Sequence, residues 1–186
     1  MAGMSALGAL VVVLLLIGLV ALLIYNKLVR ARLKVREAWS TVEVQLQRRY
    51  SLIPNLVETV KGYAAHERET LDSVTAARSA LQKAGGPGEA SEANNMLTGA
   101  LKSLFAVAEA YPDLKANENF AQLQRDLADT EDKISYARTY YNATVREYNT
   151  AAQTMPNVLL AGIMGFHPAE FFQGSDESQA EVAVRF

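Results

Sequence analysis

Charged side chains are absent from the first twenty-six residues, and five basic residues then follow within ten positions. The stretch 4–25 is apolar apart from Ser5 and glycines, and it is long enough to cross a bilayer as one helix. The basic residues come directly after it, with Glu37 as the single acid beside them: Lys27, Arg30, Arg32, Lys34 and Arg36. We therefore expect residues 1–26 to form a transmembrane anchor, and the five basic residues to form a stem that contacts lipid headgroups.

The anchor has the features of an uncleaved signal anchor. No basic residue precedes it, and residues 22–26 offer no small-residue cleavage site, unlike a cleaved secretory signal. Because Lys and Arg resist crossing the membrane, their position after the anchor predicts an outside amino terminus and a cytoplasmic body. The rule is statistical, so a periplasmic body stays as the alternative.

Charge is unevenly distributed along the rest of the chain. Residues 27–49 hold seven basic and two acidic side chains, whereas residues 50–186 hold eleven basic and eighteen acidic ones. The basic stretch suits anionic lipid, and the acidic body argues against nucleic acid as a partner. The chain contains no cysteine, which excludes disulfides and thiolate metal sites.

Apolar residues after the anchor follow helical spacing nearly throughout. Neither glycine nor proline occurs between Tyr25 and Ile53, so the membrane helix is expected to continue through the stem. Pro54 predicts a kink or a restart, with Ser51 as a cap for the new helix, because proline lacks an amide proton. A second helical pattern covers residues 56–81.

Two further helical patterns complete the body. The first covers residues 91–110 and ends in a turn at residues 111–113, and the second is the longest, from Asn117 to Met155. Heptad-like spacing in such helices predicts left-handed packing between antiparallel neighbours. The expected fold is all-α: a transmembrane helix that continues into an elongated antiparallel four-helix bundle with long, coiled-coil-like helices. Strand-like alternation occurs only at residues 181–186.

The expected domain limits are an anchor at residues 1–26, the helical body at 27–166 and a tail at 167–186. The apolar segment 158–166 is too short to span a bilayer. We expect it to be a short closing helix that packs on the end of the bundle. The alternative is a segment that contacts the membrane interface or a partner protein.

No arrangement of residues predicts catalysis or metal binding. His66 and Glu67 begin the sequence HERET, which lacks the second histidine of a zinc-protease helix. The other histidine, His167, precedes Pro168 in an expected loop. Neither a catalytic triad nor a phosphate-binding glycine loop can be assembled, so we expect no enzyme, no cofactor and no metal.

A polar junction surrounds the proline: Arg48, Arg49, Asn55 and Glu58. Backbone groups freed by Pro54 need hydrogen-bond partners there. One interpretation is a surface that recognises a partner or transmits a signal from the stem. The favoured interpretation is an internal network that holds two helices in register, with Glu131 or Arg138 opposite.

Two Tyr–Asn pairs repeat at a spacing of seven residues: Tyr141 with Asn142, and Tyr148 with Asn149. This spacing places both pairs on one face of a helix. Asparagine beside a core typically fixes the register of packed helices, and tyrosine buries its ring while its hydroxyl keeps a partner. We therefore expect these four residues to specify structure.

The segment 46–67, LQRRYSLIPNLVETVKGYAAHE, resembles the signature of the bacterial LemA family, and matching blocks occur from residue 25 to residue 186. The resemblance implies a single-pass membrane protein with a body of long helices and no assigned enzymatic activity. Some relatives are encoded beside a membrane metalloprotease. Met155 departs from the pattern, since relatives often have an aromatic residue there.

The leading functional hypothesis is a non-enzymatic scaffold or adaptor of the bacterial inner membrane that associates with itself. The first alternative is an accessory or regulatory subunit of a membrane protease or envelope-stress system. The second is a sensor that binds a small ligand between helices. The expected partners are the lipid bilayer, copies of the chain, and a membrane protease or another envelope protein.

Overall fold

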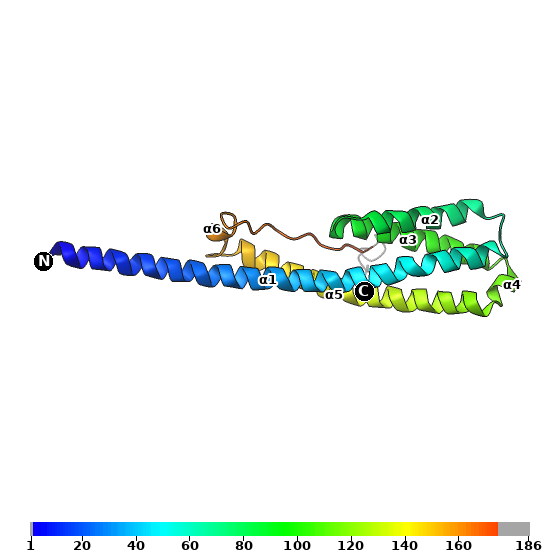
Figure 1. The fold of residues 1–186 in the computed structure, drawn as a ribbon, viewed down its shortest axis with the longest axis horizontal. Helices are drawn as coiled ribbons and strands as arrows, with labels where there is room; N and C mark the ends of the chain where they lie inside the picture. The colour runs from blue at the N-terminus through cyan, green and yellow to red at the C-terminus, as the bar shows by residue number, and fades with distance from the viewer. Residues whose placement is uncertain (1, 175–186) are drawn as a thin grey trace, which may run out of the picture. The chain divides into compact units, whose positions relative to one another are not determined.

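The structure, a computed structural model, describes residues 2–174, with side chains from residue 8 onward. Every regular element in this range is helical, which confirms the all-α class; the antiparallel four-helix bundle stays a prediction, and the alternating residues 181–186 lie outside the described range. The helices in Figure 1 are α1 (Ala2–Lys61), α2 (Arg68–Lys83), α3 (Pro87–Ala108), α4 (Pro112–Lys115), α5 (Glu118–Gln153) and α6 (Val158–Ala161).

The surroundings of α1 change along its length. From Leu10 to Leu23 every large apolar side chain is 48–68% exposed, and this part is long and apolar enough to cross a membrane. Further along, the buried residues recur at intervals of three, four and seven, as in Leu28, Val35 and Val42. An all-round apolar surface suits lipid, whereas a single apolar stripe suits packing on other helices. One helix thus supplies both kinds of surface.

Pro54 does not restart the helix, because α1 continues through it to Lys61. Proline has no N–H for the carbonyl four residues earlier, which is that of Tyr50. Arg78 of α2 supplies the missing donor, since its Nε lies 3.0 Å from the Tyr50 oxygen. Ser51 is not a cap either: its hydroxyl donates to the carbonyl of Gln47 at 2.8 Å, within the same helix.

The pattern predicted as one helix over residues 56–81 is in fact two helices. α1 ends at Lys61 and α2 begins at Arg68, with Gly62 and Tyr63 in the turn between them. Periodicity alone missed this break because apolar spacing resumes in phase at Leu71. The predicted helix at 91–110 starts earlier, at Pro87, which occupies the first helical turn where its missing N–H costs nothing.

Helix α5 agrees with the prediction for residues 117–155 to within two residues at its end. Asn117 caps its start, since its side-chain oxygen accepts the N–H of Phe120 at 3.0 Å. The expected turn at residues 111–113 overlaps the start of the one-turn helix α4, which begins at Pro112.

The chain forms two compact units, which divide α1 and α5 between them. Unit 1 comprises residues 2–37 and 143–169, and unit 2 comprises residues 38–142 and 170–174, within the described range. In unit 2, α2 and α3 lie side by side (Figure 1). The predicted limits at residues 26 and 166 stay a prediction, and each unit is described by itself below.

The Pro54–Arg78 arrangement predicts a coupling between these two positions. Arg78→Ala leaves the Tyr50 carbonyl unpaired and should lower the free energy of unfolding by about 1–2 kcal/mol. In a Pro54→Ala background, residue 54 regains an N–H for that carbonyl, so the same change should cost roughly 0.5 kcal/mol or less. Chemical denaturation of the four variants in detergent micelles measures both costs; equal costs in the two backgrounds would contradict the assignment.

Candidate functional site

The Tyr148–Asn149 pair of α5 binds the backbone of the segment that follows Phe166. The Tyr148 hydroxyl donates to the carbonyl of His167 at 2.8 Å. Asn149 pairs with both main-chain groups of Ala169: its Nδ2 donates to the carbonyl at 2.9 Å, and its Oδ1 accepts the N–H at 2.8 Å. We call these two side chains the first clamp, and all its contacts lie within unit 1.

The Tyr141–Asn142 pair makes the same contacts within unit 2. The Tyr141 hydroxyl donates to the carbonyl of Glu170 at 2.8 Å. Asn142 donates to the carbonyl of Phe172 at 2.9 Å and accepts the N–H of Phe172 at 3.0 Å. This second clamp therefore repeats the first one, with the same order of tyrosine and asparagine partners.

The seven-residue spacing of the two clamps along α5 matches a three-residue spacing along the segment that they bind. Seven residues of α-helix advance by about 10.5 Å, and three residues of extended chain advance by about 10 Å. Partners shift by three residues, from Ala169 to Phe172, when the clamp shifts by seven along α5. The sequence predicts that the pairs fix the register of packed helices; their hydrogen bonds go instead to non-helical backbone at residues 167–172.

Both clamp tyrosines are buried. Burial raises the pKa of Tyr141 to about 12, and the charge of Glu170 adds to this rise. Burial also raises the pKa of Tyr148, against an opposing effect of Arg32. Both phenols are therefore protonated donors at neutral pH. In unit 2, the Trp39 ring packs on Tyr141 and Phe172, with centroids 5.3 and 5.9 Å apart.

Arg49, from the predicted polar junction, lies inside unit 2 and is 3% exposed. Its guanidinium donates to Asn94 at 2.5 Å and to Thr98 at 3.0 Å, two α3 residues one turn apart. Glu131 of α5 forms an ion pair with it at 2.6 Å. Burial lowers the pKa of Arg49, and Glu131 opposes that shift. The geometry is that of the internal network, and Asn94 and Thr98 were not among its predicted members.

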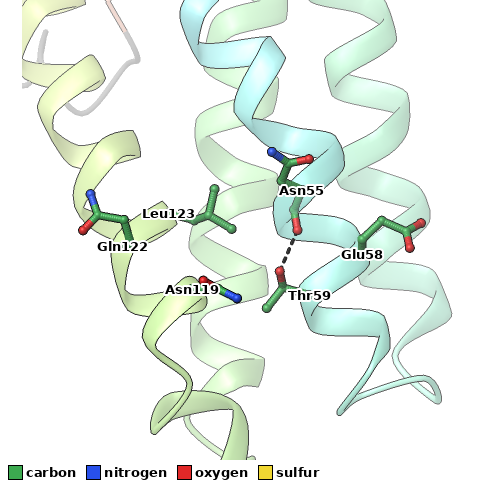
Figure 2. A pocket seen from close by; sticks show the side chains of 6 residues that line it. All are labelled: Asn55, Glu58, Thr59, Asn119, Gln122 and Leu123. Carbon is green, nitrogen blue, oxygen red and sulfur yellow. Dashed lines mark hydrogen bonds between the residues drawn. The ribbon is translucent and has the colours of Figure 1, made fainter.

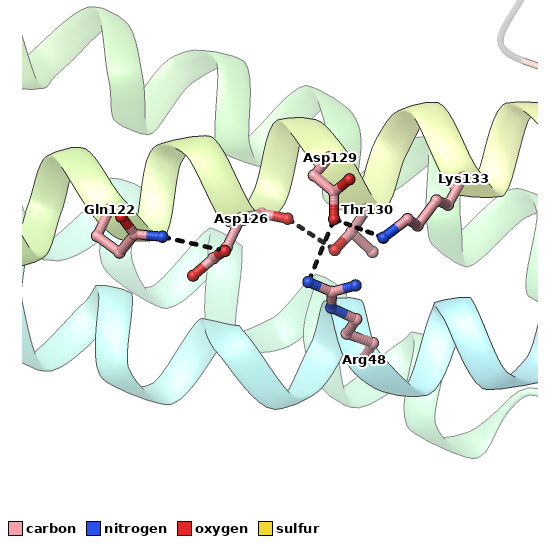
Figure 3. Close-up of polar contacts among 6 residues, drawn as sticks. All are labelled: Arg48, Gln122, Asp126, Asp129, Thr130 and Lys133. Carbon is pink, nitrogen blue, oxygen red and sulfur yellow. Dashed lines mark hydrogen bonds and ion pairs between the residues drawn. The ribbon is translucent and has the colours of Figure 1, made fainter.

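Arg48 points to another set of groups, as Figure 3 shows. It forms an ion pair with Asp129 of α5 at 3.2 Å, and Lys133 binds the same carboxylate at 2.9 Å. The hydrogen bond from Lys133, with the charges of Lys133 and Arg48, lowers the pKa of Asp129. These side chains are nearly half exposed, so the contacts fix orientation more than they add stability.

Asn55 and Glu58, the other two junction residues, are exposed and lie apart from Arg49. They line a groove of about 440 Å³ between α1 and α5, together with Thr59, Asn119, Gln122 and Leu123. Figure 2 shows Thr59 and Asn119 pointing toward each other from the two helices. The structure thus separates the four junction residues into a buried network, a surface pair and a polar groove.

The five basic stem residues are all exposed on α1. Their spacing distributes them around the helix, as a collar at headgroup level requires. Arg32 has a further contact, because its guanidinium lies 4.9 Å from the centre of the Phe166 ring. Within the described residues, no group of three or more His, Asp or Glu side chains is placed to hold a metal ion.

Helix α5 of unit 2 exposes two tyrosines one turn apart, and α1 exposes a valine. Val44 is 57% exposed, Tyr136 79% and Tyr140 54%. Tyr136 borders a groove whose other lining residues are Thr41, Gln45, Asp132, Lys133 and Ala137. In the described part of the chain, the buried side-chain oxygen of Gln45 has no hydrogen-bond partner. Exposed tyrosines beside a groove are suited to protein contact.

Comparison with known proteins gives three informative matches. A model of the LemA family matches residues 38–186. Protein LemA of Metamycoplasma hominis is 27% identical over 161 residues, which is 84% of this chain and 72% of that protein. Magnetosome protein MamQ of Magnetospirillum gryphiswaldense is 30% identical over 174 residues, 80% of this chain and 64% of that protein. The chain thus spans less than two thirds of MamQ.

The clamps predict a selective loss of stability. Asn149→Ala or Asn142→Ala leaves the N–H and the carbonyl of Ala169 or Phe172 without partners, so each should lower the free energy of unfolding by about 1–3 kcal/mol. Asn119→Ala, at an exposed position on the same helix, is the matched control and should change it by less than about 0.5 kcal/mol. Denaturation in micelles gives the three values, and similar values for all three variants would rule out the clamps.

Proposed function

The chain belongs to the LemA family, and on that premise we propose that it is a membrane-anchored, non-enzymatic helical scaffold that associates with copies of itself. The anchoring is supported by α1, whose exposed apolar part and buried stripe belong to one uninterrupted helix.

Self-association is supported chiefly by the face of α5 that exposes Tyr136 and Tyr140, one turn apart. Tyrosine is enriched at the energetically dominant positions of protein interfaces, because its ring gives a large contact area at low entropic cost. The groove beside Tyr136, lined also by Thr41, Gln45 and Ala137, gives that face a concave site for a side chain of a second copy. The surrounding charges, Asp132 and Lys133, have opposite signs, so the same face can meet itself without net repulsion.

We place the anchor in the inner membrane with the amino terminus outside and the body in the cytoplasm. The exposed basic collar directly after the apolar part of α1 supports this orientation. A regulatory subunit of a membrane protease is the alternative function, and it would use the same face for a different protein. A ligand sensor has weaker support, since the grooves of unit 2 are open to solvent.

Self-association is tested by the mass of the full chain in a mild detergent, measured by light scattering. The wild type should be an oligomer, and Tyr136→Ala with Tyr140→Ala should weaken its assembly at least tenfold. Met96→Ala is the control: Met96 is 58% exposed on α3, away from this face, and its loss should leave the mass unchanged. A monomeric wild type would contradict self-association. A monomer that co-purifies stoichiometrically with a membrane protease would favour the alternative.

A further inference from the structure

The segment between α5 and the residues that the first clamp binds is unusually apolar for an exposed loop. No Asp, Glu, Lys or Arg occurs between Glu147 and Glu170. Within this span Met155 is 72% exposed, Leu159 61% and Ile163 85%. We call residues 154–166, which include the one-turn helix α6, the closing loop. Several apolar side chains grouped on one short loop call for a covering surface.

The closing loop packs on the apolar part of α1, within unit 1. Together they line a groove of about 340 Å³ whose walls are almost wholly apolar: Leu16, Ile17, Val20, Ala21 and Ile24 from α1, with Pro156, Leu159 and Leu160 from the loop. All five α1 residues precede Lys27, the first charged residue. In a helix that crosses a bilayer, residues before the basic collar lie at the depth of the hydrocarbon. The part of the loop that touches them must share that depth.

The backbone of the closing loop is built to leave few groups unpaired. The N–H groups of Leu160 and Ala161 donate to the carbonyl of Asn157, and that of Met164 donates to Leu160. Gly165, with φ of 73°, then ends the turn, so that Phe166 N–H reaches the Ala161 carbonyl at 2.9 Å. Unpaired backbone polar groups are costly in hydrocarbon, so this internal pairing lowers the cost of inserting the loop.

The end of the closing loop has the residues expected at a lipid–water boundary. The Phe166 ring lies 5.7 Å from that of Tyr25, at the end of the apolar stretch of α1, and the Arg32 guanidinium lies over the Phe166 ring. Aromatic rings and basic side chains gather at this level of membrane proteins. The loop therefore has an apolar tip, internally bonded backbone and an interfacial base.

From these contacts we propose that the closing loop inserts into the leaflet in which the anchor ends, and that its groove with α1 holds an acyl chain of a membrane lipid. The occupant is lipid because the groove is continuous with the exposed apolar surface of the anchor. The proposal rests on the membrane-anchored part of the proposed function and is independent of self-association. It adds a second membrane contact, about 130 residues after the anchor in the sequence.

Insertion is tested in full-length protein reconstituted into vesicles of phosphatidylcholine and phosphatidylglycerol. The chain has no cysteine, so single cysteines at Ile163, Leu14 and Met96 can carry an environment-sensitive fluorophore. Ile163→Cys and the anchor control Leu14→Cys should both be quenched by spin-labelled acyl chains and protected from aqueous iodide. Met96→Cys, in the body, should show the reverse.

Each other outcome overturns the proposal in a distinguishable way. Iodide quenching at position 163 with lipid quenching at position 14 would leave the anchor intact and reject the inserted loop. Protection of position 163 from both quenchers would mean that a protein, such as a second copy, covers the loop. Absence of lipid quenching at position 14 would reject the anchor itself, and with it the membrane part of the proposed function.

Occupancy of the groove needs a second measurement. Ala21→Trp fills the groove, whereas Ala9→Trp places the same side chain on the anchor away from the residues that line it. A lipid with a photoreactive group near the end of one chain should cross-link to residues 156–160 in the wild type and in Ala9→Trp, and at least fivefold less in Ala21→Trp. Equal cross-linking in all three proteins would reject a bound acyl chain.

Discussion

The hydrogen bonds from the two Tyr–Asn clamps to the main chain decide how the chain continues after α5. Each asparagine pairs with both the N–H and the carbonyl of one residue, and each tyrosine adds a bond to a carbonyl two residues earlier. Because the clamps bind backbone, the side chains of the bound segment are free to pack. Phe172 does so against Trp39 in unit 2. Residues 167–169 are thus bound within unit 1, and residues 170–172 within unit 2.

The same bonds give the closing loop its fixed ends. In unit 1 the loop begins after α5 and ends at Phe166, directly before the residues that the first clamp binds, and the Phe166 ring contacts Tyr25 and Arg32. A loop fixed at both ends can keep Leu159 and Leu160 on the apolar part of α1. Free in solution, its exposed apolar side chains would favour aggregation. In the proposed position beside the membrane anchor, the same side chains contact lipid instead of water.

Much of this fold follows from sequence pattern. The anchor, the uninterrupted helix through the stem and the long helix after Asn117 are set by apolar spacing, by charge and by the absence of glycine and proline. The partners of the polar residues could not be predicted this way. Pro54 signalled a free carbonyl at Tyr50, but its donor, Arg78, lies beyond the next turn and has no local signature. Similarly, the repeat of Tyr–Asn showed a shared face without showing what lies against it. Because the clamps bind main-chain atoms, the bound segment carries no side-chain pattern that could have revealed them.

The central claim is that residues 167–172 are held on α5 by the clamps, and amide hydrogen exchange of the unmodified full chain in micelles tests it most directly. The amides of Ala169 and Phe172 donate to clamp oxygens. They should therefore exchange far more slowly than in an unstructured peptide, at rates comparable to amides inside α5. Exchange of both amides at the rate of a free peptide would contradict the account.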